Sequence, residues 1–231
     1  MRTTSMTSNS NFYTTEGITL KVCPPSLYRS IIPELAVLLK SCVDSNVTMN
    51  FIQPFSLEDA SEFWLSAEDN VMQGKQFVVI AQEAKEKPEP KAQAGGLLHD
   101  PSDQQEGTDD HVIEPPVILG CVILYLSQLP NAKHRGEVGK LIVGKEHRKR
   151  GIGKMLLSCL EDEAREHGRT ILQYRKSANH VEFKVLDTQT GSGAELFYEH
   201  IGYTKVGVIP DVTMAPDGTQ YTSCTFFYKK L

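Results

Sequence analysis

A basic, glycine-containing turn at residues 148–154 (RKRGIGK) joins an apolar run to a segment with helical periodicity. The apolar run Leu141-Ile142-Val143 predicts a strand, and the spacing of apolar residues in 152–167 predicts a helix. Gly151 and Gly153 allow the backbone to turn tightly and to approach a ligand closely. Successive N–H groups and the positive end of the helix dipole then point at one place. This order of elements predicts an α/β protein with an anion-binding site at the start of the helix.

Five basic side chains in and beside the turn suit a ligand that carries several phosphates: Lys145, Arg148, Lys149, Arg150 and Lys154. The common nucleotide loops fit poorly, because a P-loop requires Gly-x-x-x-x-Gly-Lys-[Ser/Thr] and a dinucleotide-binding fold requires Gly-x-Gly-x-x-Gly. Residue 156 is Leu156, so the third glycine of the dinucleotide pattern is missing. A solvated basic turn before a surface helix is the alternative to a phosphate site.

The pattern that the turn does match is Arg-x-x-Gly-x-Gly, and it resembles the pyrophosphate loop of the GNAT superfamily of acetyl-CoA-dependent N-acetyltransferases. Glu137, four residues before the apolar run, stands where the superfamily often places its general base. Residues 194–198 (AELFY) and then Gly202-Tyr203 resemble the family's A-x-x-x-Y…G-[FY] helix and turn. Residues 135–229 look most like the tabtoxin-resistance acetyltransferase subgroup. One departure is Gly191, where many members carry Asn.

The resemblance implies that acetyl-CoA is the co-substrate and that no metal takes part. In the family, backbone groups of the strand hold the pantetheine arm, which places Leu141, Ile142 and Val143 beside the cofactor. Ser192, just before the second motif helix, is a further candidate. The turn supplies the remaining predicted cofactor-binding residues, which are Arg148, Lys149, Arg150, Gly151, Ile152, Gly153 and Lys154.

Amide formation from an amine and a thioester requires a neutral amine and a hydrogen-bond donor for the thioester oxygen. Glu137 is the predicted base. The alternative is that its carboxylate only forms an ion pair with Lys140 or Arg135. Asp187 is the rival base, and its alternatives are anchoring a cationic substrate or capping a turn. Backbone N–H groups near Leu141 are expected to hold the thioester oxygen.

The departing thiolate must also be protonated, and the family places a tyrosine for this role. Tyr198 is the predicted general acid, because a phenol with a pKa of about 10 suits protonation of a thiolate better than a carboxylic acid does. The alternative is that Tyr198 only packs against the core from an amphipathic helix, like its neighbour Phe197.

The chain is expected to form one domain at residues 18–231, after a disordered tail at residues 1–17. Residues 83–116 are polar and aperiodic and predict a flexible insertion between two paired strands. Strands are expected at residues 18–22, 77–81, 117–126, 137–143, 183–186, 204–209 and 224–229, and helices around residues 31–42, 56–67, 152–167 and 193–200. The resemblance implies a GNAT-like mixed α/β fold, with a mostly antiparallel sheet of about seven strands flanked by about four helices. Its fourth and fifth strands are expected to splay.

Composition narrows the partners of the chain. The formal net charge of -5 argues against nucleic acid as the main partner. No run approaches the roughly 18 apolar residues that span a membrane. The five scattered cysteines form no CxxC pair or His/Cys cluster, which indicates a reducing compartment rather than a zinc site. Residues 1–17 contain no apolar signal segment, so a cytoplasmic location is expected. Similar proteins are often homodimers.

The acceptor is the least determined part of the reaction. Resemblance to the subgroup favours a primary amine on a small polar molecule, such as an antibiotic, a toxin or an amino-acid-like metabolite. Phe51, Phe55 and Trp64, with the loop at residues 211–222, are candidates to line its cleft, although core packing is the common fate of a tryptophan. Two alternatives stay open, a peptide or protein amine and a catalytically silent acetyl-CoA-binding regulatory module.

Overall fold

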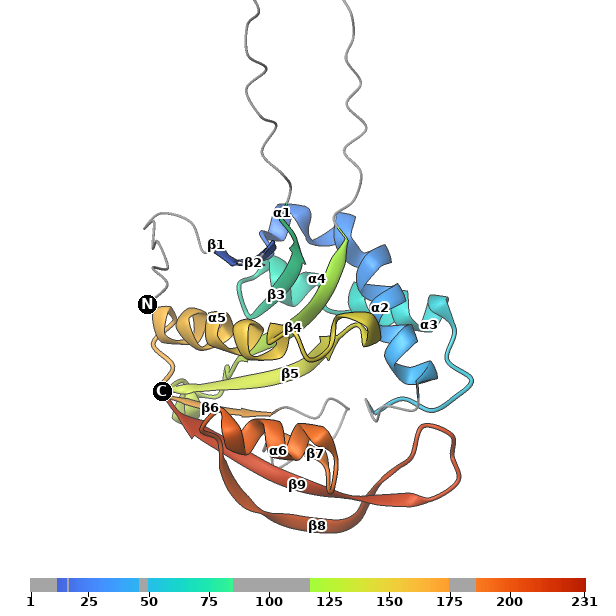
Figure 1. Cartoon of the computed structure of the whole chain (residues 1–231). Coiled ribbons are helices and arrows are strands. Elements are labelled where there is room, and N and C mark those ends of the chain that lie inside the picture. Colours follow the sequence, from blue (N-terminus) through green and yellow to red (C-terminus); the bar gives the residue numbers. More distant parts are fainter. Residues whose placement is uncertain (1–11, 16, 46–49, 85–116, 175–185) are drawn as a thin grey trace, which may run out of the picture.

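The computed structural model describes residues 12–15, 17–45, 50–84, 117–174 and 186–231 (Figure 1). Almost all of the expected insertion therefore lies outside the described residues. The expected tail is wrong for Phe12–Thr15, which form strand β1 and pair with residues 18–21 of the next strand. In the described part of the chain, no helix combines the length and apolarity that crossing a bilayer requires.

The described residues build one open, nine-stranded sheet. Its strands are β1, β2 Ile18–Val22, β3 Gln76–Glu83, β4 Ile118–Leu126, β5 Arg135–Val143, β6 Ile171–Tyr174, β7 Leu186–Gln189, β8 Thr204–Met214 and β9 Tyr221–Lys230. Strands β1 to β6 pair with one another in sequence order. Strand β9 pairs with both β6 and β7, and β8 pairs with β9 on the edge opposite to β7. Of the described pairs, only β5 and β6 run parallel. The expected mixed, mostly antiparallel GNAT-like sheet is confirmed.

Helices cover both faces of this sheet (Figure 1). They are α1 Pro25–Tyr28, α2 Ile32–Asp44, α3 Leu57–Leu65, α4 Glu68–Met72, α5 Ile152–Glu166 and α6 Gly193–His200. Side chains alternate along a strand, so Val78 and Ile80 of β3 pack with α2 and α3 in one core, while Val79 and Ala81 pack with α5 in the other. Burial on both faces explains why the central strands are apolar throughout rather than alternating.

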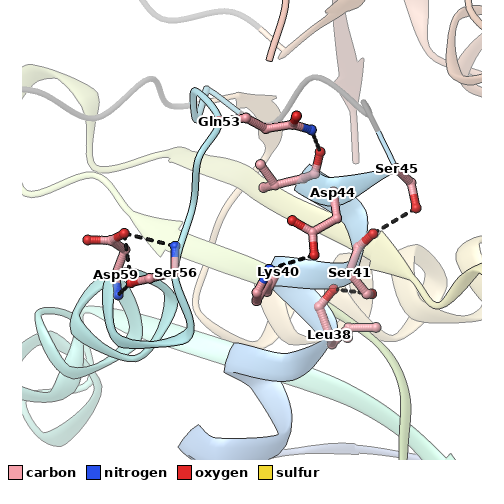
Figure 2. Close-up of polar contacts among 9 residues, drawn as sticks. Leu38, Lys40, Ser41, Asp44, Ser45, Gln53, Ser56 and Asp59 are labelled. Carbon is pink, nitrogen blue, oxygen red and sulfur yellow. Dashed lines mark hydrogen bonds and ion pairs between the residues drawn. The ribbon is translucent and has the colours of Figure 1, made fainter. Parts of the chain in front are cut away.

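A capping box fixes the start of α3. The hydroxyl of Ser56 accepts a hydrogen bond from the Asp59 N–H at 3.0 Å, and the Asp59 carboxylate accepts one from the Ser56 N–H at 2.9 Å (Figure 2). The preceding segment is fixed as well. The side-chain amide of Gln53 donates to the Val43 carbonyl, and its backbone N–H donates to the Pro216 carbonyl at 2.7 Å. This ties residues 50–56 to α2 and to the β8–β9 turn.

The fifth strand differs from its prediction. Residues 183–185 lie outside the described residues, and Leu186 begins β7. A strand that was not expected, β6, pairs in parallel with β5 from Arg135 to Val138. Strands β6 and β7 lie end to end along the same edge of β9. The described pairing of β5 with β6 extends to Val138, and no described pair joins β5 to β7. Because residues 175–185 lie outside the described residues, the expected splay of the fourth and fifth strands stays a prediction.

Candidate active site

The glycine turn places an open helix start beside the end of β5. A short 3-10 turn, η3 Lys145–His147, leads from β5 to Gly151, which caps α5 with a left-handed φ of 78°. Such a φ favours glycine. Among the described residues no side chain caps α5, and its first helical bond runs from the Met155 N–H to the Gly151 carbonyl. The N–H groups of the first turn are therefore available to an anion.

The basic residues of the turn divide into two kinds. The guanidinium of Arg148 donates to the Val143 carbonyl at 3.1 Å and reaches Sγ of Cys42 at 3.7 Å, so it ties the turn to β5 and α2. Arg150 approaches Nδ1 of His147 at 3.3 Å from an exposed position. Lys145, Lys149 and Lys154 are exposed too. The structure thus surrounds the start of α5 with positive charge, while Arg148 also orders the turn.

A β-bulge interrupts β5 directly before the expected cofactor contacts. Cys121 of β4 pairs with Ile142 and Ile123 pairs with Gly139, so Lys140 and Leu141 together stand opposite the single residue 122. Lys140 takes a φ of 45°, which is uncommon for a residue with a side chain. The bulge shifts the alternation of faces by one residue. As a result, Leu141 packs toward the α5 side and Ile142 toward the α2 side.

Close packing explains the glycine before the bulge. A Cβ on Gly139 would lie 2.6 Å from Cε2 of Tyr125, the β4 residue that pairs with Glu137. No ordinary Cβ contact is that short, so a larger residue would displace the tyrosine ring. Gly139 therefore allows Tyr125 to cross the face of β5 that carries Glu137.

Glu137 is buried, with 3% of its surface exposed. Its Oε1 lies 3.9 Å from Nη2 of Arg135, two residues earlier on the same face of β5. The expected alternative, an ion pair with Arg135, is thus present at long range and does not exclude a role in proton transfer. Glu137 pairs with Gln173 of β6, one residue before the last described β5–β6 pair. Its role as the general base stays a prediction.

Asp187 and Tyr198 come together between β7 and α6. Asp187 lies on β7, and its carboxylate is near enough to influence both Tyr198 and Lys140. Burial, with Asp187 as a second cause, raises the pKa of Tyr198 above its ordinary value of 10.0. Burial lowers the pKa of Lys140 to about 8, and Asp187 acts in the opposite direction. The predicted acid, the rival base and a lysine that the sequence did not single out as catalytic therefore form one electrostatic group.

Tyr198 is held rigidly by aromatic packing. Its ring centroid lies 5.4 Å from that of Tyr203 and 5.7 Å from that of Phe227, and 6% of the residue is exposed. The packing role is therefore real, and it fixes the orientation that a general acid needs. Helix α6 also abuts the start of α5, because a Cβ on Gly153 would lie 3.4 Å from the Phe197 ring. The two predicted motifs are neighbours in space.

The turn before α6 depends on Glu195, to which the sequence analysis assigned no role. Its carboxylate accepts hydrogen bonds from the Gly191 N–H at 2.6 Å, from Nζ of Lys205 at 2.7 Å and from the Thr225 hydroxyl at 3.0 Å. Lys205 first, and then the Gly191 N–H, lower the pKa of Glu195 to about 2. An acid in the first turn of a helix was the available signal. Gly191 has a φ of 78°, a conformation that Asn also tolerates, so its departure from the family pattern is conservative.

Ser192 is the N-cap residue of α6, although its side chain makes no capping hydrogen bond. Its Oγ lies 3.3 Å from the Thr188 hydroxyl of β7. The contact of Ser192 with the cofactor stays a prediction.

An open hollow of about 500 Å³ lies on the α3 side of β5. Its lining is mainly apolar with an acidic rim, and consists of Phe51, Ile52, Pro54, Phe55, Asp59, Glu62, Phe63 and Ser66. Two of the expected acceptor-cleft residues, Phe51 and Phe55, are therefore in place. Trp64 is fully buried in the core, so the alternative expectation for this residue, core packing, is confirmed. The β8–β9 loop meets this segment through the Gln53–Pro216 hydrogen bond.

The fold and the site together define an acetyltransferase of the GNAT class. The model of the acetyltransferase (GNAT) family matches residues 51–182, more than half of the chain, and the protein belongs to this family. In the described residues, no group of three or more His, Cys, Asp or Glu side chains could hold a metal ion.

Solved structures show the same fold at low sequence identity. A GCN5-related N-acetyltransferase from Kribbella flavida aligns with a TM-score of 0.62 and 14% identity over 94% of this chain and 100% of that chain. The yncA protein of Salmonella typhimurium, solved with its cofactor acetyl-CoA, aligns with a TM-score of 0.60 and 16% identity over 94% and 95%. A ribosomal-protein-alanine N-acetyltransferase from Brucella melitensis aligns with a TM-score of 0.57 and 17% identity over 92% and 99%.

Proposed function

We propose that the protein transfers the acetyl group of acetyl-CoA to a primary amine of a small polar molecule, such as an antibiotic, a toxin or an amino-acid-like metabolite. The observation that carries this proposal is the uncapped start of α5, ringed by exposed basic side chains and placed beside the opening between β5 and β7. A phosphate-bearing ligand that enters there would direct its other end toward Glu137 and Tyr198.

The residues of the site fit acetyl-CoA. The N–H groups at the start of α5, with Lys149, Arg150 and Lys154, would hold the pyrophosphate. The backbone of Leu141 to Val143 would accompany the pantetheine arm, and Ser192 would lie across the opening. Acetyl-CoA supplies an acetyl thioester, which an amine can attack directly.

Each step of the direct attack then has a residue of this chain beside it. Glu137 would take the proton from the amine, and the Leu141 N–H would stabilise charge on the thioester oxygen. Tyr198 would protonate the departing sulfur. Its raised pKa keeps the phenol protonated before the reaction, although it also makes the phenol a weaker acid than an exposed tyrosine. Asp187 is the alternative base. Holding both substrates in one opening would contribute a large part of the rate increase.

The hollow on the α3 side supports a small acceptor, because its volume of about 500 Å³ is that of a small-molecule site. The Brucella melitensis structure, titled a ribosomal-protein-alanine N-acetyltransferase, keeps a protein acceptor as the second candidate. A peptide would have to extend from the hollow across residues 50–56.

Release of free thiol from acetyl-CoA tests the proposal with amino acids, β-lactam dipeptide analogues, polyamines, aminoglycosides and short peptides as acceptors. We expect turnover with one small-molecule class, and its loss in Tyr198→Phe with retained acetyl-CoA affinity. Turnover with peptides alone would support the second candidate. Acetyl-CoA binding without turnover on the whole panel would indicate a catalytically silent module.

A further inference from the structure

Among the described residues of β5, Lys140 is the basic residue whose side chain the bulge turns into the interior. In an unbroken strand, residue 140 would share a face with Val138, which packs toward α5. The bulge places it instead on the face of Gly139 and Glu137, toward α2 and α3. A lysine in a left-handed conformation costs backbone energy, and such outliers concentrate at functional sites.

The ammonium of Lys140 lies beside the acceptor hollow. Its Nζ is 4.4 Å from the centroid of the Phe51 ring and 5.2 Å from that of Phe63, and 8% of the residue is exposed. The same two rings line the hollow. The cation is therefore placed where the hollow approaches the reacting centre, and the rings stabilise it through cation–π contacts.

Lys140 lies between the hollow and two carboxylates. Its ammonium contacts the Phe51 and Phe63 rings, Asp187 of β7 is near enough to act on its pKa, and Glu137 stands three residues earlier on the same strand. An acceptor that carries a carboxylate close to its amine would match this arrangement, with its anion toward the lysine and its nitrogen toward the carboxylates.

We propose that Lys140 binds the carboxylate of the acceptor, and that the acceptor is an α-amino acid. This inference rests on the acetyl transfer proposed above and assigns its substrate class. Lys140 disfavours a second cation beside it at the inner side of the hollow, whereas Asp59 and Glu62 lie at the rim. An internal or N-terminal peptide residue has no free α-carboxylate to offer the lysine.

The pKa of Lys140 agrees with this role. At about 8, it leaves most of the amine protonated at neutral pH although burial opposes the charge. A bound carboxylate would favour the protonated form, and a charge-assisted hydrogen bond to a desolvated ammonium is among the stronger contacts in proteins.

The test compares the twenty α-amino acids with their α-carboxamides as acceptors, by thiol release from acetyl-CoA at pH 7. The wild-type protein, Lys140→Met and Lys140→Arg are assayed, and acetyl-CoA affinity and the melting temperature are measured for each. Methionine keeps the length of the side chain without the charge, and arginine keeps the charge.

We expect the wild-type protein to acetylate at least one amino acid with a kcat/KM about 10- to 100-fold above that of its carboxamide. Lys140→Met should abolish this preference by raising KM for the acid, with much less effect on the amide and on acetyl-CoA affinity. Lys140→Arg should restore most of it. A role limited to packing would lower both activities equally.

Equal activity on acids and amides would overturn the inference, as would acetyl-CoA binding with no turnover on any of the twenty acids. Both results leave the proposed acetyl transfer standing if another amine is acetylated. Failure to bind acetyl-CoA would instead overturn the proposed function itself, and this inference with it.

Discussion

Nη2 of Arg135 lies 3.9 Å from Oε1 of Glu137, and both side chains project from the same face of β5 just before the strand parts from β6. The arginine is thus the described ion-pair partner of the carboxylate, at long range. The contact is long enough that the carboxylate keeps capacity for a second partner. A structural ion pair and a catalytic base are compatible at this position.

Replacement of Glu137 by glutamine should lower turnover by about 10²-fold, because general base catalysis contributes at least that much. Acetyl-CoA affinity, measured by calorimetry, should not change, since Glu137 is not among the proposed cofactor contacts. Glu83→Gln, at the exposed end of β3, is the matched control. Wild-type turnover in Glu137→Gln at every pH would remove this residue from the mechanism.

The two arginines of the turn should respond differently to alanine. Arg148→Ala loses the hydrogen bond to the Val143 carbonyl, so it should weaken acetyl-CoA binding and lower the melting temperature together. Arg150→Ala should weaken acetyl-CoA binding several-fold at constant stability, because its side chain is exposed. Calorimetry and thermal denaturation separate the two effects. An unaltered dissociation constant in both variants would refute the phosphate site.

Gly139→Ala should destabilise the fold by about 1–3 kcal/mol, because the new methyl group meets the Tyr125 ring at 2.6 Å and forces it to move. Gly207→Ala in β8 is the control, since no heavy atom lies within 4 Å of its added Cβ. Urea denaturation of the two variants measures the difference. Equal stabilities would show that the tyrosine ring shifts without cost and that glycine is not required at the bulge.

Glu195→Gln should lower stability in a pH-dependent way. The folded pKa of about 2 lies below the ordinary value of 4.5, so the carboxylate stabilises the fold fully above about pH 4.5. That contribution should disappear as the pH falls from there toward 2. Melting temperatures of wild type and variant should therefore differ at pH 6 and converge near pH 2 to 3. A constant difference across this range would assign the effect to packing rather than to charge.

Lys140→Met should have the opposite pH dependence, at higher pH. The folded pKa of about 8 lies below the ordinary 10.5, so burial of the ammonium destabilises the wild-type fold in full below pH 8. Between pH 8 and 10.5 the unfolded chain holds a proton that the folded protein has lost, so wild-type stability rises with pH. Lys140→Met should be more stable than wild type at pH 7, by about 1–3 kcal/mol at most, with the advantage shrinking toward pH 10. Denaturation at pH 7 and pH 10 checks this, and an advantage that does not shrink would contradict it.

Much of this site could be predicted from short stretches of sequence. Glycines at 151 and 153 between an apolar run and a helix specify the turn, and Ser56 with Asp59 specifies the start of α3. These signals act through backbone conformation and hydrogen bonds within a few residues. Strand β6 was not predicted, because a segment of four residues is too short for its hydrophobic periodicity to identify it as a strand.

The sequence by itself indicated the family, the glycine turn proposed to bind phosphate, and the candidates Glu137 and Tyr198, because each depends on residue type and close spacing. Only the tertiary structure decided where the side chains of Lys140 and Glu195 lie. The first depends on a bulge formed by the pairing of β5 with β4, and the second on partners as distant as Thr225. Strand register and packing between remote segments set which face a side chain occupies, and a one-residue shift reverses that face. The composition of the acceptor site is therefore a property of the folded sheet.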